Sequence, residues 1–470
     1  MKRTNYKYSI ILGLALFLAA CAGSDGIGGT TEVPGEQPLP VTFEPTYGEM
    51  EAVSRAGTVG PVNDMNDLRS RFVGVYAYYT GNSNWATASA STIPNFMYNE
   101  QLSYVPVGTD GLGNDLYAWT YEPIKYWPND NNPADNAGAI GSQTHNYLSF
   151  FAYAPYVGNG DGTMTSPAVA SASESGIVGQ TANTATGAPK ITYNWTDEVA
   201  NQVDLLWATN QNCYKYDVND ANDDGRTSDK VLLNFRHALA AIDVYVRRVY
   251  DETSVTDRHP DNDTDTKIFV SEVKLTPATA MVIKGELQLS DGVWTNTTNQ
   301  PAAKAVAIDE NSMPDKVRGT KSEAANYIRI YELDKWSMTD AGGSPVTSGV
   351  TEEETRLFST NQLMMLIPQT RTFTPQITYS YITRDNDLEL GYITDTAGNR
   401  YSRIVNTVTG TAINDFELQA GKKYKLLCLI GVEHVSFEIV EVEDWDFPMR
   451  YTPDVVTPTD GEIEKTVNEE

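Results

Sequence analysis

The stretch RFVGVYAYYT, residues 71–80, decides the fold of this chain, because it is a short run of aromatic and β-branched residues. Such residues are enriched in strands. Turn-forming clusters such as DGLGND and GNGDG separate this run from others of the same kind. Those runs lie at residues 102–108, 116–128, 147–156, 190–195 and 202–210. Short strands at this spacing, with no helix-period segment between them, predict a sandwich or a barrel.

A second series of strand-like runs starts near residue 230, after the polar stretch KYDVNDANDDGRTSD. A chain of 470 residues is too long for one ordinary sandwich core, so two domains are expected. The sequence therefore predicts an all-β protein with one sandwich at 56–228, a second at 229–447 and a polar acidic tail at 448–470. RHALAAI, residues 236–242, is compatible with a single helical turn.

The charge of the chain is strongly negative, since 62 acidic residues stand against 34 basic ones. The formal net charge is -28 and the pI is near 4.5. A field of this sign repels nucleic acid and anionic membrane surfaces, so we expect no nucleic-acid partner. Solubility at high density on a surface is the simplest interpretation of this charge.

The N-terminus has the features of an export signal. A basic segment, MKRTNYK, precedes the apolar stretch IILGLALFLAA, which is too short to span a bilayer. The sequence LAAC, which ends at Cys21, resembles the bacterial lipobox, in which the cysteine takes a diacylglycerol and the chain is cut before it. Residues 1–20 are then a lipoprotein signal peptide, and acyl chains on Cys21 hold the protein in the outer membrane. The alternative is an ordinary secretory signal with an incidental cysteine.

Residues 21–55 combine a spacer rich in Gly, Pro and Thr with one short strand. In LPVTFE, residues 39–44, apolar and other residues alternate, which predicts a half-buried strand. Its inward face consists of Leu39, Val41 and Phe43. Arg55 follows, and it is the only basic residue between Lys7 and Arg69. One isolated arginine suits a single proteolytic cut; the alternative is an uncut, exposed arginine.

No motif typical of an enzyme occurs, since HExxH, GxSxG, phosphate-loop and CxxC patterns are all missing. We therefore expect neither catalysis nor a cofactor. The segment DANDDG opens like a calcium loop, with Asp220, Asn222 and Asp224 as weak candidate ligands. Val231 stands at the twelfth position, where such a loop needs a carboxylate, so a solvated acidic loop is the better interpretation.

Three cysteines form no disulfide framework. Cys428 lies in the apolar run YKLLCLIGV, which predicts a buried thiol. Whether it pairs with Cys213 is left open by the sequence.

Five pieces of sequence occur in a fixed order over roughly residues 55–447 and the signal before them. They are the lipobox, YWP followed by LSFFAYAPY, NFRHALAAIDVYV, LMMLIPQ, and the end segment AGKKYKLLCLIGVEHVSFEIVEVEDWD. Together they resemble the fimbrillin-like family, the subunits of type V pili of Gram-negative anaerobic bacteria. The resemblance implies two tandem transthyretin-like β-sandwich domains, export as a lipoprotein and assembly into surface fibres.

The resemblance also implies processing. In the family a trypsin-like protease cuts after an arginine in the N-terminal segment, which here is Arg55. The cut releases the lipidated piece together with the strand of Leu39, Val41 and Phe43, and an extended strand of another pilus subunit fills the open groove. The donor is expected at the C-terminus, where VSFEIVEVEDW places its apolar face on Val435, Phe437 and Ile439.

Two features of the C-terminus complicate that assignment. The apolar register shifts at Val440 and Val442, which indicates a bulge or a strand that serves two surfaces. The polar tail also contains PDVVTP, residues 453–458, as a second candidate donor.

The resemblance thus implies a structural or adhesive pilus subunit assembled by donor-strand exchange after proteolysis near Arg55. Stalk, tip and anchor roles stay open, although a cut favours the first two, and loops at 80–98 and 115–136 are candidates for an adhesive tip surface. The alternative from another class is a surface glycan-binding lipoprotein that stays monomeric and anchored. Exposed tryptophans would stack on its sugars, and the candidates are Trp85, Trp119 and Trp127.

Overall fold

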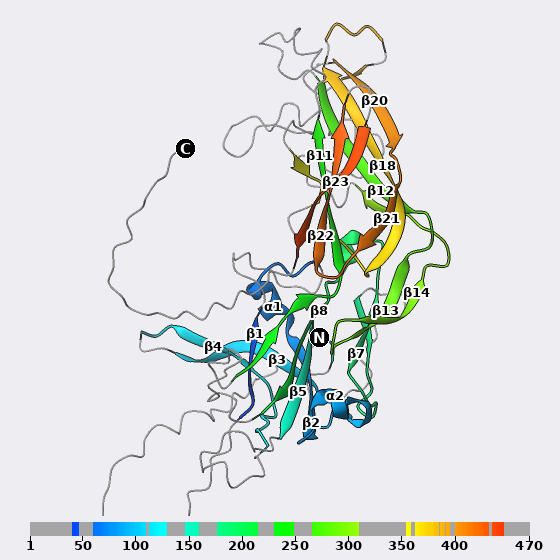
Figure 1. Cartoon of the computed structure of the whole chain (residues 1–470). Helices are drawn as coiled ribbons and strands as arrows, with labels where there is room; N and C mark the ends of the chain where they lie inside the picture. The colour runs from blue at the N-terminus through cyan, green and yellow to red at the C-terminus, as the bar shows by residue number, and fades with distance from the viewer. Residues whose placement is uncertain are drawn as a thin grey trace, which may run out of the picture. The chain divides into compact units, whose positions relative to one another are not determined.

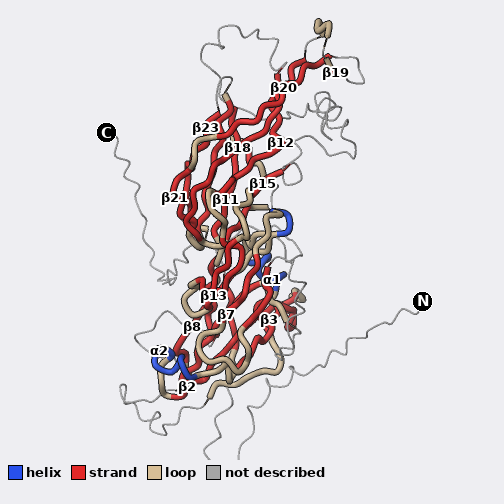
Figure 2. The backbone as a smooth tube through the Cα atoms, turned by 90° about the vertical axis from the view of Figure 1, so that its right-hand side faces the viewer, coloured by secondary structure: helices blue, strands red, loops and turns tan. Residues whose placement is uncertain are grey.

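The structure is a computed structural model, and β-strand is the main secondary structure of the chain that it describes (Figure 2). It describes residues 40–46, 60–109, 112–128, 146–158, 176–214, 230–248, 266–309, 354–358, 362–384, 386–390, 392–394, 400–431 and 435–445. The prediction of an all-β protein is confirmed. Within these residues, no helix is both long enough and apolar enough to cross a membrane.

One six-stranded antiparallel sheet is built mainly from the first series of runs (Figure 1). Its order is β10-β8-β5-β2-β3-β4. The bounds are β2 Val73–Gly81, β3 Met97–Thr109, β4 Asp115–Thr120, β5 Tyr147–Ala154, β8 Leu206–Cys213 and β10 Arg236–His237. RFVGVYAYYT supplies β2, whose residues from Val73 to Tyr78 are all buried. Aromatic and β-branched residues therefore place this strand in the middle of the sheet.

The second half of the chain forms two further sheets, ordered β16-β11-β22-β23 with β17 on β11, and β15-β12-β18-β20-β19 with β21 on β18. The first consists of β11 Ala240–Arg248, β16 Thr355–Arg356, β17 Met364–Leu366, β22 Lys422–Ile430 and β23 Val435–Asp444. The second consists of β12 Thr266–Pro277, β15 Val306–Asp309, β18 Gln369–Arg384, β19 Ile393–Thr394, β20 Arg400–Thr409 and β21 Ile413–Leu418.

Strand pairings cross the predicted boundary at residue 228. A four-stranded sheet has the order β14-β13-β7-β6, with β6 Gly176–Gln180, β7 Lys190–Asn194, β13 Val282–Gln288 and β14 Trp294–Asn299. A two-stranded sheet joins β1 Thr42–Thr46 to β9 Lys230–Asn234. The division into sandwiches at 56–228 and 229–447 stays a prediction, and the observed sheets combine strands from both sides of it.

Short helices occur where the sequence suggested none. They are α1 Met65–Arg71, α2 Trp85–Ala88, η1 Ser89–Ser91 and η3 Val199–Asn201. Asp64 caps α1, since its carboxylate accepts from the backbone N–H groups of Asn66 and Asp67. The helical turn considered for residues 236–242 is absent: β10, a bend and the start of β11 occupy these residues.

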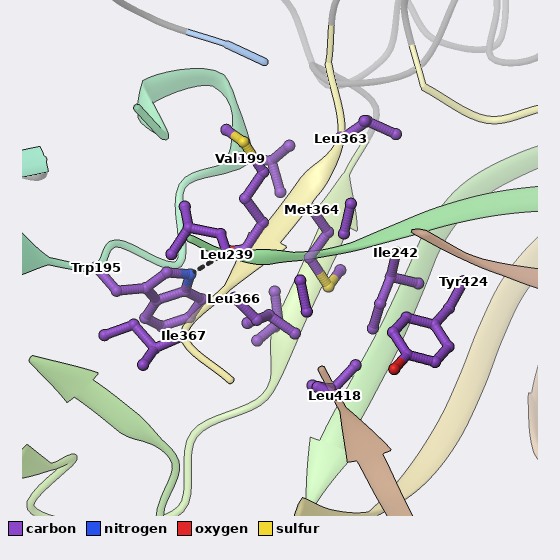
Figure 3. Packing of buried hydrophobic residues seen from close by; sticks show 14 of the residues in the cluster. Trp195, Val199, Leu239, Ile242, Leu363, Met364, Leu366, Ile367, Leu418 and Tyr424 are labelled. Atoms are coloured by element: carbon purple, nitrogen blue, oxygen red, sulfur yellow. Dashed lines mark hydrogen bonds between the residues drawn. The ribbon is translucent and has the colours of Figure 1, made fainter. Parts of the chain in front are cut away.

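A continuous apolar core links strands from both series of runs. Trp195, just after β7, donates from its indole Nε1 to the carbonyl of Met365 in β17 at 2.6 Å (Figure 3). Leu239, Ile242 and Leu366 pack in the same cluster. A buried tryptophan needs a partner for its N–H, and a backbone carbonyl from the second half of the chain provides it here.

Candidate functional site: the place of the first strand

The strand before Arg55 is held on both of its edges. β1 runs parallel to β9, with Thr42 opposite Lys230 and Thr46 opposite Asn234. At its start, Pro40 forms an antiparallel bridge with Tyr126, and the N–H of Val41 donates to the carbonyl of Lys125 at 2.8 Å. We call the surroundings of β1 the β1 site; they consist of β9, Tyr121, Lys125, Tyr126 and Phe150.

The inward face of β1 is buried among aromatic rings. Val41 is 0% exposed and Phe43 is 3% exposed. The ring of Phe43 lies edge-on to Tyr121, with centroids 5.5 Å apart, and edge-on to Phe150 at 5.4 Å. Such pairs add about 0.5–1.5 kcal/mol beyond the burial of their area. Trp127 packs in turn against Phe150 at 5.9 Å, which extends the aromatic cluster under β1.

Pro45 continues this buried face, and the expected strand is therefore longer than its predicted end at residue 44. The N–H of Val41 points away from β9, whereas the carbonyl of Thr46 accepts from the N–H of Phe235 in the β9 segment at 2.9 Å. Pro45 lies four residues after Val41, so the backbone nitrogens of both face the same edge of the strand. The N–H that proline lacks therefore falls on the edge away from β9. A proline in a strand is tolerated at such an edge.

Tyr121 fixes the position of β1 along the site. Its hydroxyl donates to the carbonyl of Val41 at 2.9 Å and accepts from the N–H of Lys125 at 3.2 Å. Burial raises the pKa of Tyr121 to about 12, so the hydroxyl remains a donor at neutral pH. The outward face carries Glu44, whose carboxylate lies 3.8 Å from the ammonium group of Lys230.

Arg55 and Leu39 lie outside the described residues, and so does Cys21, but the chain is anchored on both sides of Arg55. β1 precedes it, and Gly60 follows, donating from its N–H to the carbonyl of Gln202 at 2.8 Å. The guanidinium of Arg71 donates to the carbonyls of Gly60 and Pro61 at 2.9 and 3.0 Å. The segment 47–59, with Arg55 in it, therefore connects two fixed points.

A buried cluster continues from this second anchor. The carboxylate of Asp204 accepts from the N–H of Val62 at 2.8 Å. The ring Nδ1 of His237 lies 3.1 and 3.0 Å from the two oxygens of the same carboxylate, and both side chains are fully buried. His237 also contacts Trp445, which lies at the end of β23 and stacks on the imidazole. The segment after Arg55 and the end of β23 thus share one cluster.

β23 carries the candidate donor residues. Val435, Phe437 and Ile439 are half-buried and pack against the core, while Glu438 and Val440 on the other side are exposed. Among the described strands, β22 is the one that β23 pairs with. The register shifts between Lys425 and Leu426, which leaves Val440 as the extra residue of a bulge. The sequence predicted an irregularity at this position.

Two of the three tryptophans expected on the surface are buried. Trp85 is 5% exposed and packs against Tyr78 and Phe151, and Trp127 is 8% exposed. Trp119 in β4 is half-buried beside Tyr104. The correction has a simple reason: Trp85 begins the short helix α2 and Trp127 lies beyond the end of β4, and the polar sequence around each does not tell which side chain meets the core.

The remaining candidates from the sequence are the two cysteines and the weak calcium ligands. Cys213 and Cys428 are buried and do not form a disulfide with each other. Burial raises the pKa of Cys428. Asp220, Asn222 and Asp224 lie outside the described residues. Within the described part of the chain, no cluster of His, Cys, Asp or Glu is suited to hold a metal ion.

Sequence reasoning missed the residues that receive β1. Tyr121 and Phe150 lie in runs that were predicted as strands, yet nothing local indicates that residues 41–45 cover them. The proximity of Tyr121 to Pro123, which disfavours a continuing strand, is the one available signal that the chain turns there.

Comparisons with known proteins agree with this architecture. A family model described as fimbrillin-like matches residues 65–445. The chain is similar to fimbrium subunit Fim1C of Phocaeicola vulgatus, with 24% identity over 391 residues, which are 79% of this chain and 81% of the relative. It is also similar to the crystal structure of a fimbrial protein from Bacteroides vulgatus, with a TM-score of 0.50 at 20% identity. That alignment covers 79% of this chain and 92% of the other, and it bears on the fold alone.

Proposed function

Because this chain belongs to the fimbrillin-like family, we propose that it is exported as a lipoprotein, cut after Arg55 and assembled into a surface pilus by strand addition. The family consists of fimbrial structural subunits, so the chain is a subunit of this kind and not an enzyme. The observation that carries the proposal is the position of β1. The strand before Arg55 is paired along β9 and buried at Val41 and Phe43.

An empty β1 site would be strongly unfavourable. Burying a large apolar side chain contributes about 1.5–3 kcal/mol, so Val41 and Phe43 together contribute about 3–6 kcal/mol. Each hydrogen bond along the ladder adds about 0.5–1.5 kcal/mol net. The sum is a large part of the roughly 5–15 kcal/mol that stabilises an ordinary domain. A subunit that has lost β1 therefore takes up another strand.

The covalent link through residues 47–59 explains why a cut is needed. While β1 is attached, it competes for its own site at an effective concentration on the order of millimolar. Cleavage after Arg55 converts β1 into a separate peptide that diffuses away. The second anchor, at Gly60 and Val62, keeps the new N-terminus in place.

The same cut would release the membrane tether. Lipidated Cys21 and β1 lie on one side of Arg55, and the rest of the described chain lies on the other. One proteolytic event by a trypsin-like enzyme then detaches the subunit from the outer membrane and opens the β1 site. This order of events suits a stalk or tip subunit, whereas an anchor subunit keeps its lipid.

The proposed donor is β23, with Val435, Phe437 and Ile439 as its inward face. Among the described strands it lies at the end of its sheet, and the three residues of this inward face are half-buried rather than fully buried. The glycan-binding alternative has lost support, because Trp85 and Trp127 are buried and unable to stack on a sugar. Trp119 with Tyr104 and Tyr117 is the aromatic group that remains for it.

Limited trypsin treatment of the purified chain tests the proposal. We expect one early cut that gives an N-terminus at Ala56, followed by ladders of assembled subunits on native gels. Arg55→Gln should stay intact and monomeric. Arg69→Gln is the matched control: Arg69 is the next basic residue and lies in α1, so its loss should change neither cleavage nor assembly.

Two results would contradict the proposal. One is a chain that loses residues up to Arg55 and remains monomeric. The other is an Arg55→Gln variant that assembles as well as the cut protein does.

A further inference from the structure

Exposed apolar side chains gather on the hairpin of β3 and β4 and on the loop that follows it (Figure 1). In the described part of the chain, fifteen large apolar side chains are exposed. We call six of them, which all lie within residues 107–126, the hairpin patch: Val107, Leu112, Leu116, Tyr117, Ile124 and Tyr126. Exposed apolar patches mark interaction sites, and tyrosine is enriched where proteins bind one another. The hairpin patch therefore has the composition of a docking surface.

The hairpin patch adjoins the β1 site. Tyr121 follows β4 directly, and its hydroxyl accepts from the N–H of Lys125, which closes the loop after the strand. Tyr126 then forms the bridge to Pro40, just before β1. Ile124 is 43% exposed and Tyr126 is 51% exposed. Exposed apolar side chains therefore border the end of the site at which β1 enters.

The direction of β1 decides where the body of a donor subunit lies. β1 runs parallel to β9, and the residues at its start lie beside Tyr126. A donor strand near the C-terminus of a second copy follows nearly all of that copy's chain. When this strand enters in the direction of β1, its first residue lies at the Tyr126 end of the site. The folded body that precedes the strand then faces the hairpin patch.

The second copy carries an exposed apolar surface at the matching place, the start of β23. Gly431 directly follows β22, and the hydroxyl of Tyr381 in β18 donates to its carbonyl at 2.9 Å. Tyr381 lies opposite Ile404 in β20. Ile404 is 59% exposed, and its neighbour Val405 is 56% exposed. Four residues of chain reach at most about 14 Å, so Val435 remains near these side chains even when β23 leaves its sheet.

We propose that the hairpin patch of one copy binds Ile404 and Val405 of the copy that donates to it. This inference rests on the proposed function and adds a second contact to the one that the donor strand makes. A standard interface uses about 20–30 residues a side, whereas β1 has five. Contact between the two apolar surfaces supplies part of this difference and removes both surfaces from water.

Charged substitutions on the two surfaces test the contact. The acceptor, expressed from Ala22 onward, carries Ile124→Glu and is cut with trypsin, which is then inhibited. The donor carries Ile404→Lys, a fluorescent label at its N-terminus and Arg55→Gln, so it cannot be cut and can only donate. Fluorescence anisotropy of the donor, titrated with cut acceptor, gives the dissociation constant. We expect each substitution alone to raise this constant about tenfold, because a charge then meets an apolar surface.

Matched controls separate this contact from a general effect of charge or stability. They are Val293→Glu in the acceptor and Val293→Lys in the donor, since Val293 is 51% exposed and lies between β13 and β14, outside both surfaces. The controls should bind as the original chains do. Urea denaturation of every uncut variant should match that of the original chain.

The combination of the two substitutions identifies the contact itself. An acceptor with Ile124→Glu and a donor with Ile404→Lys should recover most of the lost affinity, because opposite charges then face each other. A pair whose affinity falls by the product of the two single effects shows that these surfaces do not meet, and it overturns the inference.

Two other outcomes separate the inference from the proposed function. Single variants that bind as tightly as the Val293 controls show that the hairpin patch does not face a second copy. The inference is then wrong, while assembly by strand addition still stands. Absence of any donor–acceptor pair between the original chains after a complete cut overturns the inference and the proposed function together.

Discussion

The imidazole of His237 lies flat on the indole of Trp445, with ring centroids 3.6 Å apart and 9° between the ring planes. His237 also contacts the buried carboxylate of Asp204, which holds the N–H of Val62. The segment that follows Arg55 and the end of β23 are thus joined through three side chains. Withdrawal of the whole of β23 removes Trp445 from this cluster.

Trp445→Ala should therefore lower the free energy of unfolding by about 3–5 kcal/mol, as truncations of buried aromatic residues do. Urea denaturation of the uncut chain measures the loss. Trp119→Ala is the control, because Trp119 is only half-buried and should cost less. Equal losses in the two variants would show that the stack on His237 contributes nothing.

Tyr121→Phe keeps the aromatic ring beside Phe43 and removes one hydrogen bond to the carbonyl of Val41. We expect β1 to be held less tightly by about 0.5–1.5 kcal/mol. Hydrogen exchange of the β1 amides in the uncut chain reports the change. Tyr126→Phe provides the comparison, since Tyr126 is 51% exposed and its variant should exchange as the original chain does.

Ionisation of the Tyr121 hydroxyl is expected to weaken the hold on β1 at alkaline pH. Burial raises its pKa from 10.0 to about 12 in the folded chain, so folding favours the protonated form. This contribution is complete below pH 10 and is lost as the pH rises from 10 to 12. Exchange of the β1 amides, corrected for its intrinsic pH dependence, should accelerate in that window in the original chain and less in Tyr121→Phe. Identical profiles would contradict the assignment.

Phe43→Ala should allow assembly without a cut. The change removes the ring that packs between Tyr121 and Phe150 and weakens β1 by about 3–5 kcal/mol. Size-exclusion chromatography of Phe43→Ala in the Arg55→Gln background should show oligomers. Thr42→Ala in the same background, on the outward face, should stay monomeric. A monomeric Phe43→Ala variant would argue that β1 does not gate assembly.

The two thiols provide a check on the core. Cys213 and Cys428 are buried and form no disulfide with each other, and burial raises the pKa of Cys428. A thiol reagent should therefore label neither residue in the native chain from Ala22 onward, and both after unfolding in denaturant without reductant. Protection that persists in denaturant would indicate a disulfide instead.

The local sequence pattern predicts some of these structural features and not others. The alternation at Val41 and Phe43 is readable because strand side chains have a period of two. The partner is not readable, since Thr46 bonds to Asn234 across 188 positions and nothing near either residue marks the pairing. The helix α1 was not predicted, because its seven residues, MNDLRSR, carry no apolar stripe.

The same limits apply to the candidate site. The slip in apolar register at Val440 gave the bulge correctly, because one extra residue reverses the faces of a strand. The aromatic slot of Tyr121 and Phe150 depends on three segments that meet only in the folded chain. Trp85 and Trp127 were expected on the surface because polar, asparagine-rich sequence flanks each of them, and such sequence does not tell which side chains turn back into the core.

The parallel alignment of β1 with β9 determines how their pairing resists a pulling force. A strand pulled along its own axis loads all the bonds of its ladder in shear, whereas a strand peeled from one end gives them up in turn. Any segment seated lengthwise against β9 therefore meets tension along the strand axis with its whole ladder at once.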